Sequence, residues 1–411
     1  MEVYEKTTHF IEFLYLCNMI KTLIISLPML VCIFCSALVL LDWWEQRIRA
    51  KARLFVFMLV ATALYGGHFI FFNHLYELMP VTDTIYCMAN LAVFPLYYLY
   101  IKEVTEEQWQ KHWQVTLLLP SLLTGLVVGT LYCLMDKQET LVFIDTFLYK
   151  GSMSNLGDYA KAQAIVHISI KFLFALQVLP ILVKGVRKIK HFNRMVETNY
   201  ADTELRKMYM AKTILVLFIV ACIVSFTVNI LGRDFFDHAP LLVAIPAFTF
   251  SALLFLLGYA GHRQTFTIYD LMLEMGHEST PSPISAEEPR TENEKEDRIE
   301  RLKKEITEAI ETEQMFLQQD LKINDIAKLL HTNRDYIYQA INIRMGISFS
   351  EYINRLRVDF AAQLMNENPK MTANEIAFRS GFSSPASFYR NFKLYKDCPP
   401  LTYKKGRASQ D

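Results

Sequence analysis

Seven apolar runs occupy about the first two thirds of the chain, and each is long enough to cross a hydrocarbon core of ~30 Å as a helix. The first run is too long for the core of a signal peptide and lacks a small-residue cleavage site, so we expect it to remain as a span. Residues 1–261 are therefore predicted to form a seven-span transmembrane helix bundle. The runs cover residues 22–41, 54–72, 81–101, 115–135, 162–183, 213–231 and 239–260.

The connections between these runs differ strongly in their basic residues. Those on one side of the bundle hold 14 Lys and Arg residues, whereas those on the other side hold four. Connections rich in Lys and Arg stay on the cytoplasmic side of a membrane. The bias therefore places the N-terminus outside and, because seven is odd, the C-terminal region in the cytoplasm.

Two polar residues of the fifth run are candidates for sensing a ligand. Lys171 lies near the middle of this run, and His167 lies four residues earlier on the same helical face. An ammonium group at this depth is costly and usually faces the bundle interior with a partner, but no Asp or Glu lies deep in another run. Either the pair serves an anionic ligand or a proton-linked switch, or Lys171 bonds to backbone carbonyls or Tyr hydroxyls or extends to the interface. The longest outer connection, residues 136–161, is either a ligand lid or a plain loop.

The pattern becomes polar after the last run. Residues 262–297 are predicted to hold a juxtamembrane helix and then a flexible linker, which is rich in Ser, Pro and Glu over residues 277–290. A further helix follows, in which apolar residues recur at spacings of three and four. This stripe is under two heptads long, so it fits a helix packed on the next domain at least as well as a coiled coil. Its residues are Ile299, Leu302, Ile306 and Ala309.

Residues 298–411 are predicted to form a domain with two helix-turn-helix patterns in tandem. In the first pattern, an apolar-faced helix over residues 323–330 precedes a polar turn, in which Asn333 can cap a second helix that begins at Arg334. A long connecting helix over residues 348–365 leads to the second copy. The second helix of such a pattern enters the major groove of DNA.

The second copy contains the local features that end and begin helices. Thr372 and Glu375 have capping-box spacing. Gly381 lies where the chain must leave a helix with a positive φ angle. Ser384 and Pro385 fit the N-cap and the first turn of the next helix. These features predict a helix, a tight turn and a second helix over residues 372–393.

The second copy resembles the DNA-binding domain of the AraC/XylS family of bacterial regulators. The resemblance covers roughly the last quarter of the chain, and it implies two recognition helices that enter successive major-groove turns on one face of DNA. The implied partners are double-stranded promoter DNA and RNA polymerase. The resemblance is carried by Ile376, Ala377, Gly381, Phe382, Phe388, Arg390, Phe392, Lys393, Pro399, Pro400 and Tyr403.

Matching this family position by position gives the residues implied to contact DNA. Arg390 and Gln339 have side chains suited to bidentate base contacts. Asp335 departs from the family because an acid repels phosphate; it either accepts from a cytosine amino group or is a helix N-terminal charge. The full set is Arg334, Asp335, Tyr338, Gln339, Ala386, Ser387, Arg390 and Lys393.

Charge and composition support this division of the chain. Residues 320–407 hold 14 basic and 8 acidic residues, a net charge of +6 that suits a phosphate-binding surface and that the zero net charge of the whole chain hides. A hydrophobic content of 52% is too high for a soluble regulator. Cys32 and Cys35 have the spacing of a metal knuckle, but they lie in an apolar run without a second pair, so we predict no metal and no cofactor.

These observations predict an all-α, one-component transcription regulator in the bacterial cytoplasmic membrane. Its seven-span bundle would sense an unknown small ligand, and its cytoplasmic domain would bind a promoter as a homodimer. In one alternative, the bundle is a receptor or transporter-like unit and linker proteolysis releases the DNA-binding domain; in another, the bundle is only an anchor. An intramembrane enzyme is not expected, because the chain lacks His-Glu-x-x-His, Gly-x-Ser-x-Gly, paired intramembrane carboxylates and a phosphate-binding glycine loop.

Overall fold

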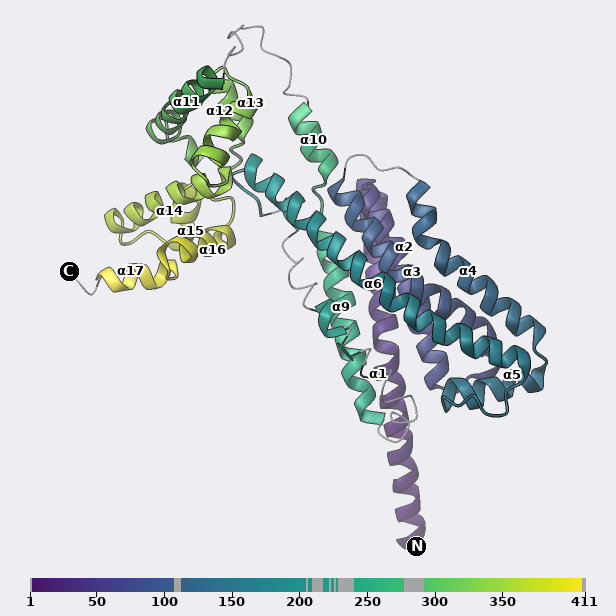
Figure 1. Ribbon diagram of the computed structural model, residues 1–411. Helices are drawn as coiled ribbons and strands as arrows, with labels where there is room; N and C mark the ends of the chain where they lie inside the picture. Colours follow the sequence, from purple (N-terminus) through teal and green to yellow (C-terminus); the bar gives the residue numbers. More distant parts are fainter. Residues whose placement is uncertain are drawn as a thin grey trace. The chain divides into compact units, whose positions relative to one another are not determined.

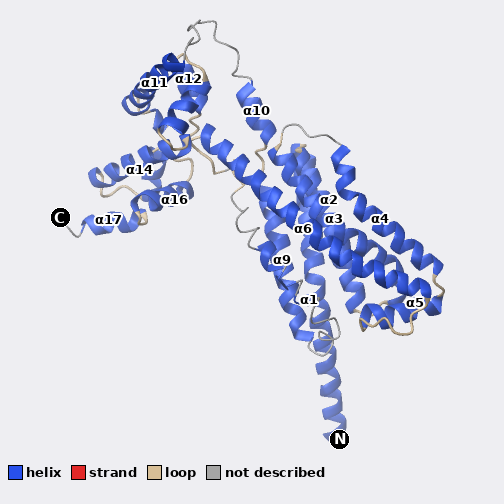
Figure 2. Cartoon of the chain, in the orientation of Figure 1, coloured by secondary structure: helices blue, strands red, loops and turns tan. Residues whose placement is uncertain are grey.

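The computed structural model describes residues 2–106, 112–204, 206–208, 217–221, 223–224, 227, 240–276 and 292–408. Over these residues the chain is helical, as predicted, and contains no strand beyond an isolated bridge between Tyr200 and Lys322 (Figure 2). The chain forms two compact units. The first contains Met1–Ile189 and Met208–Thr265, and the second contains Lys190–Lys207 and Phe266–Asp411.

Long helices build the first unit (Figure 1). Helices α9, α1, α2, α3 and α4 pack side by side in that order. Helix α6 begins in the first unit, and its last ten residues belong to the second. The helices are α1 (Glu2–Gln46), α2 (Arg49–Phe72), α3 (Met79–Thr105), α4 (His112–Leu134), α5 (Lys137–Phe143), α6 (Asp158–Asn199) and α9 (Ala244–Arg263), with short turns η1 (Tyr76–Leu78), η2 (Ile144–Tyr149) and η3 (Pro240–Val243).

Among the described residues, six helices are long and apolar enough to cross a membrane. Six of the seven predicted runs fall on them, and the remaining run, residues 213–231, lies largely outside the described residues. Large apolar side chains such as Leu126, Phe172 and Leu176 are exposed on these helices. An apolar surface of this extent marks a contact with lipid or with another protein. The helices cover Met19–Gln46, Arg49–Phe72, Tyr76–Thr105, Thr116–Leu134, Asp158–Asn199 and Ala244–Met275.

The predicted outer connection, residues 136–161, is folded rather than a plain loop. Asp136 caps α5 by accepting from the backbone N–H of Glu139 at 2.7 Å, and α5 continues into the π-helical turn η2. Phe143 and Tyr149 are buried in a core with residues of α2, α3, α4 and α6. This connection therefore closes over one end of those helices.

Shorter helices build the second unit. The leading helix α11 contributes Ile299, Leu302 and Ile306 to a core with Ile326 and Ile337, so the packed-helix alternative is the one that the structure contains. The predicted linker, residues 277–290, lies outside the described residues. The elements are α10 (Ile268–Gly276), α11 (Glu292–Thr312), η4 (Met315–Leu317), α12 (Ile323–Leu329), α13 (Arg334–Tyr338), η5 (Gln339–Arg344), α14 (Phe349–Glu367), α15 (Ala373–Arg379), α16 (Pro385–Lys396) and α17 (Pro400–Ala408).

Helix α14 joins two separate cores in this unit. Its first turns give Phe349 and Ile353 to the core of α11, α12 and α13. Its later turns give Val358 and Met365 to the core of α15 and α16. Each helix-turn-helix therefore has its own apolar core, and the long helix fixes the spacing between the two.

A buried arginine lies between the two cores. Arg357 on α14 is 1% exposed. Its Nε donates to the carbonyl of Phe316 and its Nη2 to the carbonyl of Gln318, each at 2.6 Å. Its guanidinium lies 5.8 Å from the ring centroid of Phe382. Burial lowers the pKa of Arg357 to about 10, so the group is still charged at neutral pH and ties α14 to the η4 segment.

Candidate nucleic-acid interface

The first helix-turn-helix has the predicted cap and a short second helix. Asn333 Oδ1 accepts from the backbone N–H of Asp335 at 3.0 Å, which confirms the expected N-cap. Helix α13 changes after Tyr338 into the π-helical turn η5. Ile337 and Ile341 are buried in the core, so this face of α13 and η5 is turned away from any DNA.

The four predicted contact residues of α13 and η5 lie outside the fully buried stripe, although Tyr338 packs partly against the core. Asp335 is exposed, and Arg334, Tyr338 and Gln339 are half-buried. Nη2 of Arg334 lies 4.0 Å from Oδ1 of Asp335. Asp335 lies in the first turn of α13, where the helix dipole favours a negative charge. It also lies next to Arg334, the basic group that would approach phosphate.

The second helix-turn-helix has all of the predicted local features. Thr372 and Glu375 form the capping box, with Glu375 Oε2 accepting from the backbone N–H of Thr372 at 2.8 Å. Gly381 has a φ of +81°. Ser384 Oγ accepts from the backbone N–H of Ser387 at 3.1 Å, and Pro385 begins α16. These confirmed caps fix where α16 starts.

On α16 the predicted contact residues fall into two groups. Ala386, Arg390 and Lys393 are exposed, as a DNA-facing surface requires. Ser387 is 6% exposed, and its Oγ lies 3.5 Å from Nη2 of Arg390 and 3.4 Å from Nδ2 of Asn391. The Ser387 side chain therefore contacts the Arg390 guanidinium within the protein and does not extend from the helix toward DNA.

The second unit also contains a stretch that lies between two predicted spans, and we call Lys190–Lys207 the connecting segment. Its Ala201 is buried in the core of the first helix-turn-helix. The backbone N–H of Ala201 donates to the carbonyl of Leu321 at 3.0 Å. The Ala201 carbonyl accepts from Ser350 Oγ at 3.1 Å and from Asn354 Nδ2 at 3.2 Å. The connecting segment is thus an integral part of this fold.

An acidic residue of the connecting segment contacts the second recognition helix. Glu204 accepts a hydrogen bond from Ser384 Oγ at the N-cap of α16. Its Oε1 lies 4.0 Å from Nη1 of Arg390. Recognition helices present their N-terminal residues to base edges, so Glu204 occupies the end of α16 that DNA would approach. Sequence reasoning did not find Glu204, because a contact across 180 residues leaves no local pattern.

A polar network ties α10 to the connecting segment and to the start of α12. Glu274 Oε2 accepts from Tyr200 Oη at 2.8 Å and lies 2.8 Å from Lys322 Nζ. Arg206 Nη2 donates to Asp320 Oδ1 at 2.8 Å, and its guanidinium lies 4.4 Å from the ring centroid of Tyr200. The connecting segment, which follows α6, and α10, which follows α9, therefore both contact the start of α12 in the second unit.

The two predicted sensing residues have different surroundings in the first unit. His167 is largely buried, and its Nε2 lies 2.8 Å from Oδ2 of Asp83 on α3. Lys171 lies on the exposed side of α6. The structure thus gives His167 an acidic partner that the sequence analysis did not find, since Asp83 lies near the end of its run and not deep within it. An acid inside an apolar run was the signal that could have identified it.

Comparison with known proteins agrees with this geometry. A helix-turn-helix domain family matches residues 326–406. The Msm operon regulatory protein of Streptococcus mutans is 36% identical over 85 residues, which cover 21% of this chain and 30% of that protein. The melibiose operon regulatory protein of Escherichia coli (strain K12) is 30% identical over 87 residues, which cover 21% and 28%.

A solved structure also matches, namely the C-terminal domain of AraT, a response regulator from Geobacillus stearothermophilus. It is 26% identical and has a TM-score of 0.23, and the match covers 26% of this chain and 84% of that one. The chain spans less than a third of the two operon regulators' length, and every one of these matches concerns about a quarter of the chain or less. The C-terminal region of this chain is therefore a helix-turn-helix domain of the AraC/XylS type.

Proposed function

We propose that this chain is a membrane-bound, one-component transcription regulator. Its first unit would sense a signal as a seven-span bundle, and its second unit would bind promoter DNA through α13 and α16. The observation that carries the proposal is the connecting segment, which lies between two predicted spans yet is built into the fold of the DNA-binding domain. Six long apolar helices and the similarity to operon regulators support the same assignment.

The connecting segment offers a direct route for the signal. Helix α6 is continuous from Asp158 to Asn199, and the contacts of Ala201 and Glu204 follow within five residues of its end. A ligand that prefers one arrangement of the helices shifts the protein toward that arrangement. In our scheme one arrangement keeps Glu204 on α16 and the other withdraws it, so that Arg390 becomes available to DNA.

The predicted topology is consistent with this scheme. The charge bias puts the connection between the fifth and sixth spans on the cytoplasmic side, which is also the side of the C-terminal region. The two parts of the second unit would then share one compartment with the DNA. A reporter fused to the C-terminus should be active in the cytoplasm; activity only in the periplasm would contradict both the topology and the proposal.

Release of the DNA-binding domain by proteolysis is the alternative. Cleavage in residues 277–290 would separate the second unit from its own connecting segment, which argues for a regulator that works while still tethered. The deciding experiment is chromatin immunoprecipitation together with a membrane-fraction blot of the same cells. Promoter enrichment with intact protein in the membrane supports tethered regulation, whereas enrichment with only a short soluble fragment supports release. A dimer over two half-sites and a contact with RNA polymerase remain predictions.

Replacing Arg390 with alanine should weaken binding to the specific promoter by ~1–3 kcal/mol and relax sequence preference, because a bidentate base contact would be lost. Fluorescence anisotropy with the full-length protein in nanodiscs measures this. Arg355→Ala is the matched control, since Arg355 is exposed and pairs with Glu351 on its own helix and its loss changes the net charge equally. Equal promoter affinities of Arg390→Ala and Arg355→Ala would show that Arg390 does not contact the bases.

Replacing Glu204 with glutamine should have the opposite effect. The neutral amide no longer attracts Arg390, so affinity for promoter DNA should rise by about 3–10-fold, which corresponds to roughly 1 kcal/mol for one partly exposed ion pair. Glu311→Gln removes the same charge far along the sequence from α16, on α11, where Glu311 accepts from Tyr352 Oη at 3.3 Å. An equal rise in both variants would mean that only net charge matters, and no rise in Glu204→Gln would show that Glu204 does not compete with DNA.

A further inference from the structure

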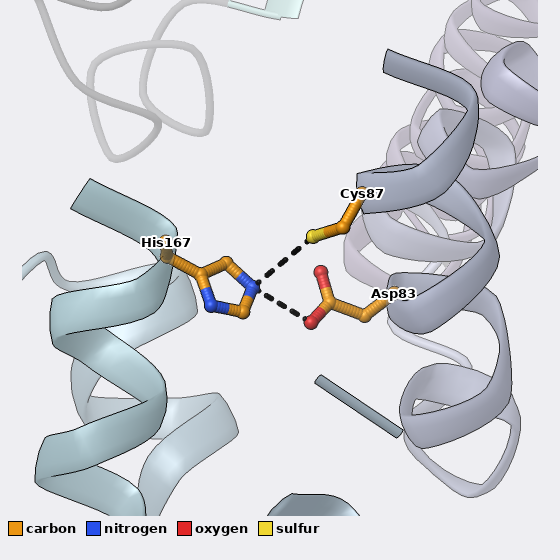
Figure 3. A group of neighbouring side chains, drawn as sticks. All are labelled: Asp83, Cys87 and His167. Carbon is orange, nitrogen blue, oxygen red and sulfur yellow. Dashed lines mark hydrogen bonds and ion pairs between the residues drawn. The ribbon is translucent and has the colours of Figure 1, made fainter. Parts of the chain in front are cut away.

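Three side chains with metal-binding atoms meet inside the first unit (Figure 3). Asp83 and Cys87 lie four residues apart on α3, so they share one helical face, and His167 faces them from α6. Their carboxylate oxygen, thiol sulfur and ring nitrogen all lie within 4.8 Å of one another. Asp83 is 8% exposed and Cys87 is 2% exposed. The arrangement brings an O, an S and an N donor together in a buried place.

The hydrogen bonds of His167 leave the correct nitrogen for a metal. Nδ1 lies 2.9 Å from the carbonyl of Gln163, one turn earlier on α6. A carbonyl only accepts, so Nδ1 carries a proton and donates. Nε2 lies 2.8 Å from Oδ2 of Asp83, so without a metal it donates to that carboxylate. Loss of this proton on metal binding would leave a lone pair on Nε2 directed toward Asp83 and Cys87. Metal-bound histidines in proteins are oriented in this way, with the other ring nitrogen donating to a carbonyl or carboxylate.

The distances suit a tetrahedral ion. Zinc bonds of ~2.0–2.3 Å to N, O and S donors put neighbouring ligand atoms about 3.3–3.8 Å apart. Nε2 of His167 lies 3.6 Å from Sγ of Cys87, which already fits. Nε2 lies 2.8 Å from Oδ2 of Asp83, so the carboxylate must move by only about half an ångström or turn to use its other oxygen.

The surroundings also resemble those of a metal site. Tyr132 Oη donates to Oδ2 of Asp83 at 2.8 Å, as outer partners of ligating carboxylates do. Phe143 and Phe147 of the folded outer connection lie edge-on to the His167 ring, with centroids 5.6 and 6.0 Å away. Gln163 is fully buried, and its Oε1 has no hydrogen-bond partner among the described residues. A water molecule bound at the fourth position of an ion would donate a hydrogen bond to this oxygen.

We propose that Asp83, Cys87 and His167 bind a divalent transition-metal ion of the zinc class. The mixed S, N and O donors favour this class over Mg²⁺ or Ca²⁺, which take oxygen ligands almost alone. The proposal departs from the sequence analysis, which expected no metal. It goes beyond the proposed function, because it concerns an ion bound in the first unit and is tested without DNA.

The test uses the full-length protein in nanodiscs, stripped with a chelator and titrated with Co²⁺ and then Zn²⁺. We expect one Co²⁺ per chain, with the visible bands of tetrahedral cobalt and a near-ultraviolet thiolate charge-transfer band, and displacement by Zn²⁺. Cys87→Ser should abolish the charge-transfer band and weaken binding by more than roughly 100-fold, because loss of even an outer partner costs about 10–100-fold. Tyr132→Phe should weaken binding within that smaller range.

Two controls match the ligands. Cys133→Ser removes an exposed cysteine of α4, and His68→Gln removes a histidine whose Nδ1 lies 3.2 Å from the carbonyl four residues earlier on its own helix. Both should bind one Co²⁺ with the charge-transfer band intact. Absence of the band in the unmodified protein, or its persistence in Cys87→Ser, would overturn the proposal and leave the cluster as a hydrogen-bonded tie between α3 and α6. If His167→Gln fails to fold, Cys87→Ser still decides.

Discussion

Replacing Arg357 with alanine is expected to destabilise the second unit by about 3–5 kcal/mol, because two carbonyls would each lose a donor at a cost of roughly 1–3 kcal/mol and a cavity would remain. The guanidinium donates to the carbonyls of Phe316 and Gln318 and is 1% exposed. Alanine would leave those buried oxygens without donors and a cavity between the two cores. Lysine should recover only part of the loss, because a point charge cannot reproduce the planar fork of donors.

Pulse proteolysis of the full-length protein in nanodiscs measures this effect, by following the intact C-terminal unit against urea through a C-terminal tag. The control is Arg355→Ala, two residues away on the same helix. Arg355 is exposed and pairs with Glu351 one turn earlier, so its loss should cost less than about 1 kcal/mol. Similar urea midpoints for the two variants would show that Arg357 does not join the cores.

The sequence predicted the local features of this unit well and its long-range contacts poorly. The caps at Asn333, Thr372 and Ser384 depend on residues two or three positions away, so spacing alone reveals them. Arg357 could only be counted as one more basic residue of a positively charged domain. Its carbonyl partners lie 39 and 41 residues earlier, and no pattern along the chain connects them.

The recognition helices show the same division. Matching to the AraC/XylS family gave the residues of α16 that are implied to contact DNA, and three of them, Ala386, Arg390 and Lys393, are exposed. Ser387 belongs to the same predicted set, but its side chain is buried. It lies one position after Ala386, and each step along a helix rotates the side chain by about 100°. The partner of Arg390 could not be predicted, since Glu204 lies in the part of the chain that the sequence assigned to the membrane bundle.

Basic residues counted for topology also have structural partners. Arg206 and Lys207 contributed to the charge bias between the fifth and sixth predicted spans, yet Arg206 pairs with Asp320 and Lys207 with Glu197 at 2.6 Å. Net charge near a span predicts the side of the membrane, but not the contacts made there. The connecting segment was therefore assigned to the bundle from sequence, while the structure packs it with the DNA-binding domain.

Hydropathy likewise predicted the long helices but not what lies between them. Six runs fall on helices of the described chain because about 20 apolar residues leave few other structures open to the backbone. The cluster of Asp83, Cys87 and His167 joins two such helices, and its members looked like isolated polar residues in separate runs. Only the packing of α3 against α6 gives them a common chemistry.

Replacing Gly381 with alanine is expected to cost about 3–4 kcal/mol, for two separable reasons. Gly381 has a φ of +81°, a conformation that costs any residue with a Cβ roughly 1–2 kcal/mol. A Cβ there would also lie 2.8 Å from the Cα and carbonyl oxygen of Leu317 and from the carbonyl oxygen of Phe316. These are backbone atoms, so no side chain can swing away, and overpacking of this kind costs a further ~1–3 kcal/mol.

Gly346 separates the two contributions. It has a φ of +71°, and a Cβ there would meet nothing within 4 Å. Gly346→Ala should therefore lose only the roughly 1–2 kcal/mol of the backbone conformation in the same pulse-proteolysis assay. The excess loss in Gly381→Ala measures the contact with the η4 segment. Because Phe316 also accepts from Arg357, Gly381→Ala combined with Arg357→Ala should cost less than the sum of the single variants; strict additivity would mean that the turn and the arginine support the two helix-turn-helix cores independently.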